Sequence, residues 1–94
     1  MGRAKDFFAT QLQTSRKTAQ KLRLLGFWQP LPDLPRFIRG RDGQEHFVAE
    51  LDYGHWSYSI TSRRPGAVLL LLSRITGTAS EILAAVEKEW PMPP

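Results

Sequence analysis

Between Gln44 and Trp90, three strand-like runs and one capped helix follow one another with only short turns between them. In the runs 47–52 and 56–61, apolar and polar residues alternate with the period of two that is typical of half-buried strands. This order predicts an α+β protein with a three- to four-stranded antiparallel sheet and a C-terminal helix. His46 is out of phase with Phe47, so we expect its side chain to be exposed.

The run from Ala67 to Ile75 is compatible with two structures. Leucine runs favour a helix, whereas a short apolar run between turn residues suits a strand that is buried on both faces. Pro65-Gly66 precedes the run and Thr76-Gly77 follows it, and both pairs are turn signals. We therefore expect a buried strand here.

The C-terminal helix has a clear start and a clear end. Thr78-Ala79-Ser80-Glu81 is a capping box, in which the threonine hydroxyl accepts from the Glu81 backbone N–H and the glutamate side chain returns the bond. A helix over 79–90 follows, and the proline-rich residues 91–94 form a tail. Its expected buried stripe consists of Ile82, Leu83, Val86 and Trp90.

The N-terminal residues 5–26 have helical spacing. One helical stripe contains the apolar residues Phe8, Leu12, Ala19 and Leu22. Because residues 13–15 favour helix caps, one long helix and a helical hairpin both fit the pattern. Gly26 provides a stop, and prolines hold 27–35 in an extended connection.

The residues Arg36–Arg41 lie between this connection and Asp42-Gly43, which is a strong signal for a tight hairpin turn. They are expected to form a short edge strand or simply extended chain.

Length and composition fit a single domain over 1–94, with a helical part at 5–26, a sheet at 36–75, a helix at 79–90 and a tail at 91–94. A chain of 94 residues has room for one modest core. The absence of cysteine excludes disulfides, thiolate zinc sites and a cysteine nucleophile. No metal or other cofactor is expected. The longest apolar run, 67–72, is far shorter than the roughly 20 residues of a membrane helix, so we expect a cytoplasmic protein without membrane contact.

Almost all of the excess positive charge lies in the first 26 residues, which sum to +5, while the rest of the chain sums to −1. The whole chain has a formal net charge of +4. This charge favours an anionic partner, most simply nucleic acid or an acidic protein. A solvated basic surface would give the same composition.

The order of these elements resembles the RelE/ParE/HigB superfamily of bacterial toxins, in particular its phage-type, HigB-like branch. The resemblance covers most of the chain and rests on five short motifs in order: Arg39-Gly-Arg41-Asp-Gly43, Glu50-Leu51, Trp56, the leucines 69–72 and Glu81-Ile82. In this pattern, the run 67–75 corresponds to a central strand that packs on the N-terminal helical segment.

The chain also departs from the superfamily pattern. Members usually begin with a strand before the first helix, and this sequence has no room for one. Asp52 and Ser57 stand where the resemblance predicts arginines, and the basic loop before the last helix is shortened to 73–77, with Arg74 as its only cation. The resemblance therefore supports the fold more strongly than the catalytic site.

The resemblance implies a small toxin–antitoxin type protein, either a ribosome-dependent mRNA endonuclease that needs no metal or a non-catalytic relative. In such cleavage a ribose 2′-hydroxyl attacks the neighbouring phosphate, which requires a base, an acid and cations. The catalytic candidates are Arg41, His55 and Arg74, with His46 as a second histidine that titrates near neutrality. The nucleic-acid-binding candidates are Arg16, Lys17, Lys21, Arg39, Arg63 and Arg64.

Tyr53 or Tyr58 is a candidate for stacking on a base. The three tryptophans are expected to be core residues or interface anchors, because aromatic side chains contribute most through buried area. The implied partners are a cognate antitoxin and RNA or the ribosome, and a homodimer fits the same pattern.

A different class of function is compatible with the N-terminal residues. The segment Ala9–Leu25 also resembles a DNA-binding helix-turn-helix, with 16–25 as recognition helix. Gln13 stands where the turn usually has glycine, and Thr14 stands where an apolar residue normally packs. A small protein-interaction module from a mobile element is a third hypothesis.

Overall fold

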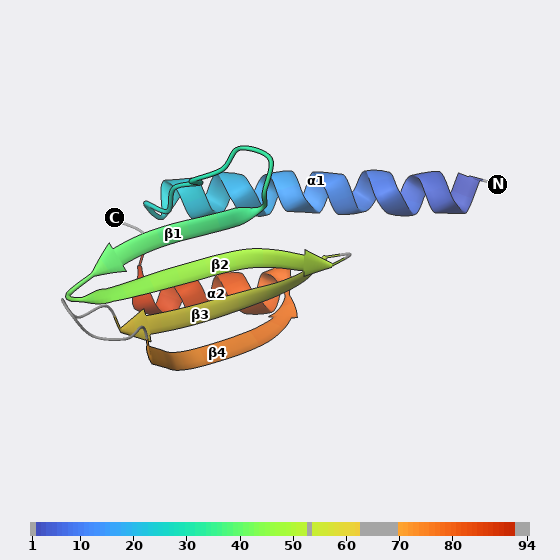
Figure 1. Cartoon of the computed structure of the whole chain (residues 1–94). Helices are drawn as coiled ribbons and strands as arrows, with labels where there is room; N and C mark the ends of the chain where they lie inside the picture. Colours follow the sequence, from blue (N-terminus) through green and yellow to red (C-terminus); the bar gives the residue numbers. More distant parts are fainter. Residues whose placement is uncertain (1, 53, 63–69, 92–94) are drawn as a thin grey trace.

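The computed structural model describes the backbone of residues 2–52, 54–62 and 70–91, with side chains from Gln13 onward. Its elements are α1 (Gly2–Leu24), β1 (Arg36–Arg41), β2 (Gln44–Asp52), β3 (His55–Ser62), β4 (Leu70–Thr78) and α2 (Ala79–Glu89). The strands form one antiparallel sheet in the order β1-β2-β3-β4 (Figure 1). The expected α+β class, with an N-terminal helix, an antiparallel sheet and a C-terminal helix, is confirmed.

The N-terminal segment forms one continuous helix, so neither the helical hairpin nor the turn of a helix-turn-helix is present in it. Residues 13–15 do not interrupt α1. The hydroxyl of Ser15 donates to Glu50 Oε2 on β2 at 2.7 Å instead of capping a second helix. Gly26 follows the helix with a φ of +87°, the left-handed conformation that glycine adopts without strain. The first half of α1 extends beyond the sheet (Figure 1).

β1 is a paired edge strand rather than free extended chain. It joins β2 through Asp42 and Gly43, whose φ angles of +50° and +74° fit the two-residue turn that matches the twist of a hairpin. The connection before β1 is also fixed to it, because the backbones of Trp28 and Ile38 exchange hydrogen bonds of 3.0 and 2.8 Å.

One face of the sheet is covered by α2 and by the end of α1, and the core lies between them. On β2 the covered side chains are His46 and Val48, both 0% exposed, whereas Phe47 and Ala49 are only partly buried and Leu51 is exposed. The expectation that His46 is exposed is therefore wrong, because the alternation along β2 has the opposite phase. The core residues are Leu22, Leu25, Phe27, Phe37, Val48, Trp56, Tyr58, Ala79, Ile82, Val86 and Trp90.

β4 is a strand, but it is neither buried nor central. It pairs with β3 at one end of the sheet order, and its residues 70–76 are exposed. It packs against α2, so the predicted central strand on the N-terminal helix is wrong. Residues 67–69 of the predicted run lie outside the described residues, and the strand continues to Thr78, beyond the predicted end at 75.

The capping box of α2 is present as predicted. Glu81 N donates to Thr78 Oγ1, and the Thr78 backbone N–H donates to the Glu81 carboxylate, both at 3.3 Å. Ile82, Val86 and Trp90 are buried and Leu83 is partly buried, as expected for the apolar stripe. Lys21 Nζ on α1 contacts Glu87 Oε1 at 2.7 Å and ties the two helices together.

Candidate functional site

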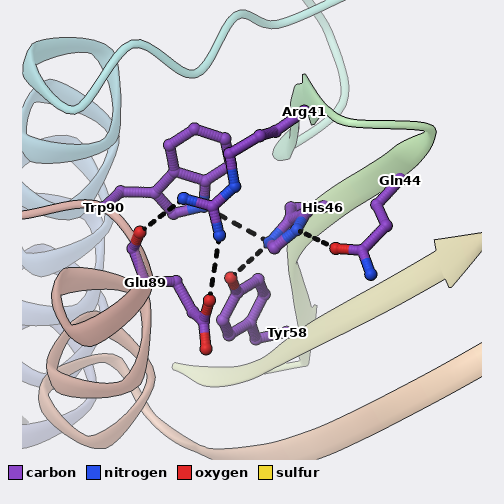
Figure 2. A network of polar contacts seen from close by, with 6 residues as sticks. All are labelled: Arg41, Gln44, His46, Tyr58, Glu89 and Trp90. Atoms are coloured by element: carbon purple, nitrogen blue, oxygen red, sulfur yellow. Dashed lines mark hydrogen bonds and ion pairs between the residues drawn. The ribbon is translucent and has the colours of Figure 1, made fainter.

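A cluster of polar contacts surrounds His46 at the end of the sheet near the β1–β2 turn (Figure 2). The Tyr58 hydroxyl lies 2.6 Å from His46 Nδ1, and the Trp90 Nε1–H group donates to the same nitrogen at 3.3 Å. On the other side of the ring, His46 Nε2 lies 3.3 Å from Gln44 Oε1. β2, β3 and the end of α2 thus meet at one imidazole.

The geometry fixes the proton on this histidine. An indole nitrogen only donates, so Nδ1 accepts, and it accepts from Tyr58 as well. The remaining nitrogen, Nε2, then carries the proton and donates to Gln44. Burial lowers the pKa of His46, the nearby Arg41 guanidinium lowers it further, and Glu89 acts in the opposite direction. His46 is therefore neutral at pH 7.

Two arginines of β1 enclose the same tryptophan. The Cζ atoms of Arg39 and Arg41 lie 3.9 and 4.3 Å from the Trp90 ring centroid, within the range of cation–π contacts. Arg41 also donates to the Glu89 carbonyl at 2.9 Å and to its carboxylate at 3.1 Å, while Arg39 donates to the Leu25 carbonyl. Both guanidinium groups are therefore held by the protein itself.

This cluster packs the end of α2 against the sheet and does not form an open acid–base site. His46 is completely buried, and its Nδ1 lone pair already accepts from two donors. Tyr58 is 4% exposed, so its ring cannot stack on a base from solution. The arrangement is suited to anchoring Trp90, and with it the end of α2, to β1, β2 and β3.

The three predicted catalytic residues lie apart. Arg41 is at the end of β1 beside Gln44, whereas His55 pairs with Asp52 at the other end of β2. Eight residue steps along a strand separate these ends by roughly 25 Å. Arg74 is exposed in the middle of β4, opposite Ser59. These residues do not form a common site for one phosphate.

The nucleic-acid-binding candidates are also dispersed. Arg16 and Lys17 are exposed on α1, Lys21 is paired with Glu87, and Arg39 is occupied by Leu25 and Trp90. Arg63, Arg64 and the stacking candidate Tyr53 lie outside the described residues. Among the tryptophans, Trp56 and Trp90 are core residues and Trp28 is 59% exposed.

An apolar strand edge, which the sequence pattern did not predict, is the most unusual surface of the described residues. Leu70, Leu71, Leu72 and Ile75 of β4 are between 43% and 62% exposed. No described strand pairs with the outer side of β4, so its outward N–H and C=O groups have no ladder partner there. We call this surface, formed by the outer side of Leu70–Thr78, the outer β4 edge. The sequence signal for this surface is the leucine run, which predicts a buried strand and not an exposed edge.

Among the residues whose positions are described, no group of three or more His, Asp or Glu side chains could hold a metal ion. No helix in the described ranges is long and apolar enough to cross a membrane. The chain matches no protein-family model, and no curated protein and no solved structure matches it significantly.

Proposed function

We propose that this chain is a small basic binding protein that takes up an extended, acidic segment of a partner protein along the outer β4 edge. The observation that carries the proposal is the coincidence of a free strand edge with four exposed, large apolar side chains. An extended segment added to such an edge gains main-chain hydrogen bonds, and pockets between alternate side chains give specificity. A monomeric protein rarely leaves an edge of this kind uncovered.

The exposed Arg74 is the reason for proposing an acidic partner segment. This residue is exposed in the middle of β4, and neither of the two salt bridges found among the described residues involves it. A carboxylate on the neighbouring strand would pair with Arg74, since opposite charges across strands are stabilising.

The class of complex that fits the resemblance in the sequence is a toxin–antitoxin pair, with this chain as the basic component. Binding is better supported than RNA cleavage, because Arg41, His55 and Arg74 lie at three separate places on the sheet. Expression of the chain alone in bacteria tests this class. Growth arrest that disappears on co-expression of the neighbouring encoded protein would support a toxin, and a harmless chain would contradict toxicity and favour a binding role alone.

The edge itself is tested with a nine-residue peptide in which valine alternates with glutamate, because β4 has nine residues. Amide hydrogen exchange of the full chain is measured with and without the peptide. Strand addition protects the outward-facing amides of β4 selectively. A second peptide with proline at its central position cannot complete the ladder and should bind about tenfold more weakly.

A matched pair of variants separates the edge from general hydrophobic contact. Leu71→Glu places a negative charge on the edge, and Leu24→Glu makes the same change on α1 at a residue of similar exposure. We expect about tenfold weaker peptide binding for the first variant, since charged edge residues oppose strand addition, and little change for the second. Equal loss in both variants would show that the edge is not the binding site.

A further inference from the structure

A cavity of about 350 Å3 lies between α1, the connection after it and the sheet, and its lining residues come from α1, residues 29–35, β1 and β3 and not from β4. Its inner wall contains Phe37 and Trp56, which are each 1% exposed. The volume is at the small end of the roughly 300–1,000 Å3 typical of ligand sites. The other lining residues are Ser15, Arg16, Ala19, Arg23, Gln29, Pro32, Asp33, Leu34 and Pro35.

Trp56, one of the lining residues, has an unusual feature. Its indole Nε1–H group is buried and has no hydrogen-bond partner in the protein, the only such side-chain group among the described residues. Buried donors are nearly always paired, because an unpaired one costs about 1–3 kcal/mol. The other described buried tryptophan, Trp90, does have an acceptor, His46 Nδ1.

Some of the remaining polar groups of the cavity have hydrogen-bond partners within the protein, whereas others have no described partner of opposite charge. Ser15 donates to Glu50, which satisfies its hydroxyl, and Gln29 accepts from Arg23 at 3.0 Å and donates to two backbone carbonyls. Arg16 is exposed, and neither it nor Arg23 has an acidic partner among the described residues. The only lining carboxylate is that of Asp33. Among the described residues, Arg16 thus has no acidic partner and the Trp56 indole has no acceptor, whereas Arg23 already donates to Gln29.

The geometry points to a second docking site here, for a short acidic peptide segment of a partner protein that inserts one large apolar side chain between α1 and residues 28–35. The apolar side chain packs on Phe37 and Ala19, a carboxylate of the segment pairs with Arg16, and a carbonyl oxygen of the segment accepts from Trp56. The Trp56 nitrogen is covered in the free protein, so the side chains around it have to shift to admit this oxygen.

A peptide suits the site better than a small enclosed ligand, because apolar surface continues past the cavity. Trp28, Leu31 and Leu34 on the connecting segment are 59%, 57% and 37% exposed, and Leu34 also lines the cavity. Leu31 lines a neighbouring cavity of about 200 Å3 on the other side of this segment. A chain that crosses the segment would cover both, as apolar anchors do at protein interfaces. This site does not depend on the outer β4 edge.

The test uses the full chain labelled with 15N, in which each of the three tryptophans gives one indole N–H signal. The Trp56 signal is assigned with the variant Trp56→Phe. Acetyl-Phe-Asp-Asp-amide is titrated to millimolar concentration, with acetyl-Phe-Asn-Asn-amide and acetyl-Ala-Asp-Asp-amide as matched probes. We expect the Trp56 indole proton to shift on binding while that of Trp90 stays in place.

The two altered probes should each bind at least about fivefold more weakly, since each lacks one of the two recognised features. Arg16→Gln should weaken binding of the acidic probe about fivefold, whereas Lys17→Gln, the same change at the neighbouring exposed cation, should not. An unmoved Trp56 signal at saturation, or equal binding of the Asp and Asn probes, would overturn the proposal. The outer β4 edge is intact in all these variants, so either proposal can fail alone.

Discussion

At the scale of single residues, His46 shows how a polar side chain becomes part of a core. Its two ring nitrogens are both used, Nδ1 as an acceptor for Tyr58 and Trp90 and Nε2 as a donor to Gln44. A buried polar group that is fully hydrogen-bonded costs little, whereas one that loses a partner costs about 1–3 kcal/mol. The imidazole is therefore tolerated at 0% exposure only in its neutral form.

We predict that His46 makes the protein less stable in acid. Its folded pKa lies below the ordinary value of 6.5, so below about pH 6.5 the unfolded chain binds a proton that the folded state excludes. The free energy of unfolding should fall between about pH 7 and pH 5, as measured by urea denaturation. His46→Gln should remove this part of the slope, and His55→Gln, at an exposed histidine, should keep it. A slope unchanged in His46→Gln would exclude His46 as its source.

We predict that Tyr58 makes the protein less stable at alkaline pH. Burial raises the pKa of its hydroxyl to about 12, from 10.0, so the unfolded chain ionises first as the pH rises. The contribution of Tyr58 to the free energy of unfolding should be fully present below about pH 10 and should decrease by roughly 2 kcal/mol as the pH approaches 12. Tyr58→Phe should remove this decrease. At pH 7 the same variant should lose about 1 kcal/mol in urea denaturation, because the hydrogen bond to His46 is gone.

At the scale of elements, the features that the sequence predicted are those fixed by neighbouring residues. The Thr78–Glu81 capping box, the Asp42-Gly43 turn and the stop at Gly26 each depend on a few adjacent residues. The continuity of α1 was not predictable in the same way. Residues 13–15 fit a cap as well as a helix interior, and the Ser15 hydroxyl instead donates to Glu50, which is distant in sequence.

At the end of α1, Gly26 has a left-handed backbone conformation and lies next to Arg39, which contacts the Trp90 ring. A Cβ atom on Gly26 would lie 2.6 Å from Arg39 Nη1, and the backbone there has a φ of +87°. Arg39 cannot move freely, because it is held by the Leu25 carbonyl and the Trp90 ring. This position therefore combines backbone strain with a crowded side chain.

We predict that Gly26→Ala lowers the free energy of unfolding by roughly 1–3 kcal/mol, the cost of a non-glycine residue in the left-handed region. Gly40→Ala is the matched control, because a Cβ there meets only Gln44 O at 3.6 Å, an ordinary contact. Thermal and urea denaturation of both variants give the comparison. Equal losses in the two variants would mean that neither the φ angle nor Arg39 is decisive.

At the scale of the whole molecule, strand order determines which apolar residues become core. Leu70, Leu71 and Leu72 are as apolar as Val48 or Ile82, but β4 comes last in the sheet, and no described strand lies beyond it. The position of a strand in the sheet is not encoded in its own residues, so the leucine run was predicted as a strand but not as an exposed edge. For the same reason, residue spacing in the sequence could not show whether the predicted catalytic residues lie close together. The structure places them on separate parts of the sheet.

The position of Arg74 disfavours pairing of the outer β4 edge with a second copy of this chain. Arg74 is the central residue of Leu70–Thr78, so a fully overlapping antiparallel pair of two copies would set Arg74 directly opposite Arg74. Like charges opposite each other are destabilising, and two copies with a formal charge of +4 also repel each other. An acidic segment has neither disadvantage.

We therefore predict that Arg74→Thr increases self-association. The substitution removes the central repulsion and introduces a residue that favours strands, while the apolar residues around it remain exposed. Sedimentation velocity over a range of concentrations should show a dimer for Arg74→Thr where the wild-type chain is still monomeric, and adding Leu71→Glu to Arg74→Thr should abolish that dimer. Arg16→Thr removes the same charge from α1 and should leave the wild-type behaviour unchanged. If Arg16→Thr dimerises equally well, net charge rather than the position of Arg74 keeps the chains apart.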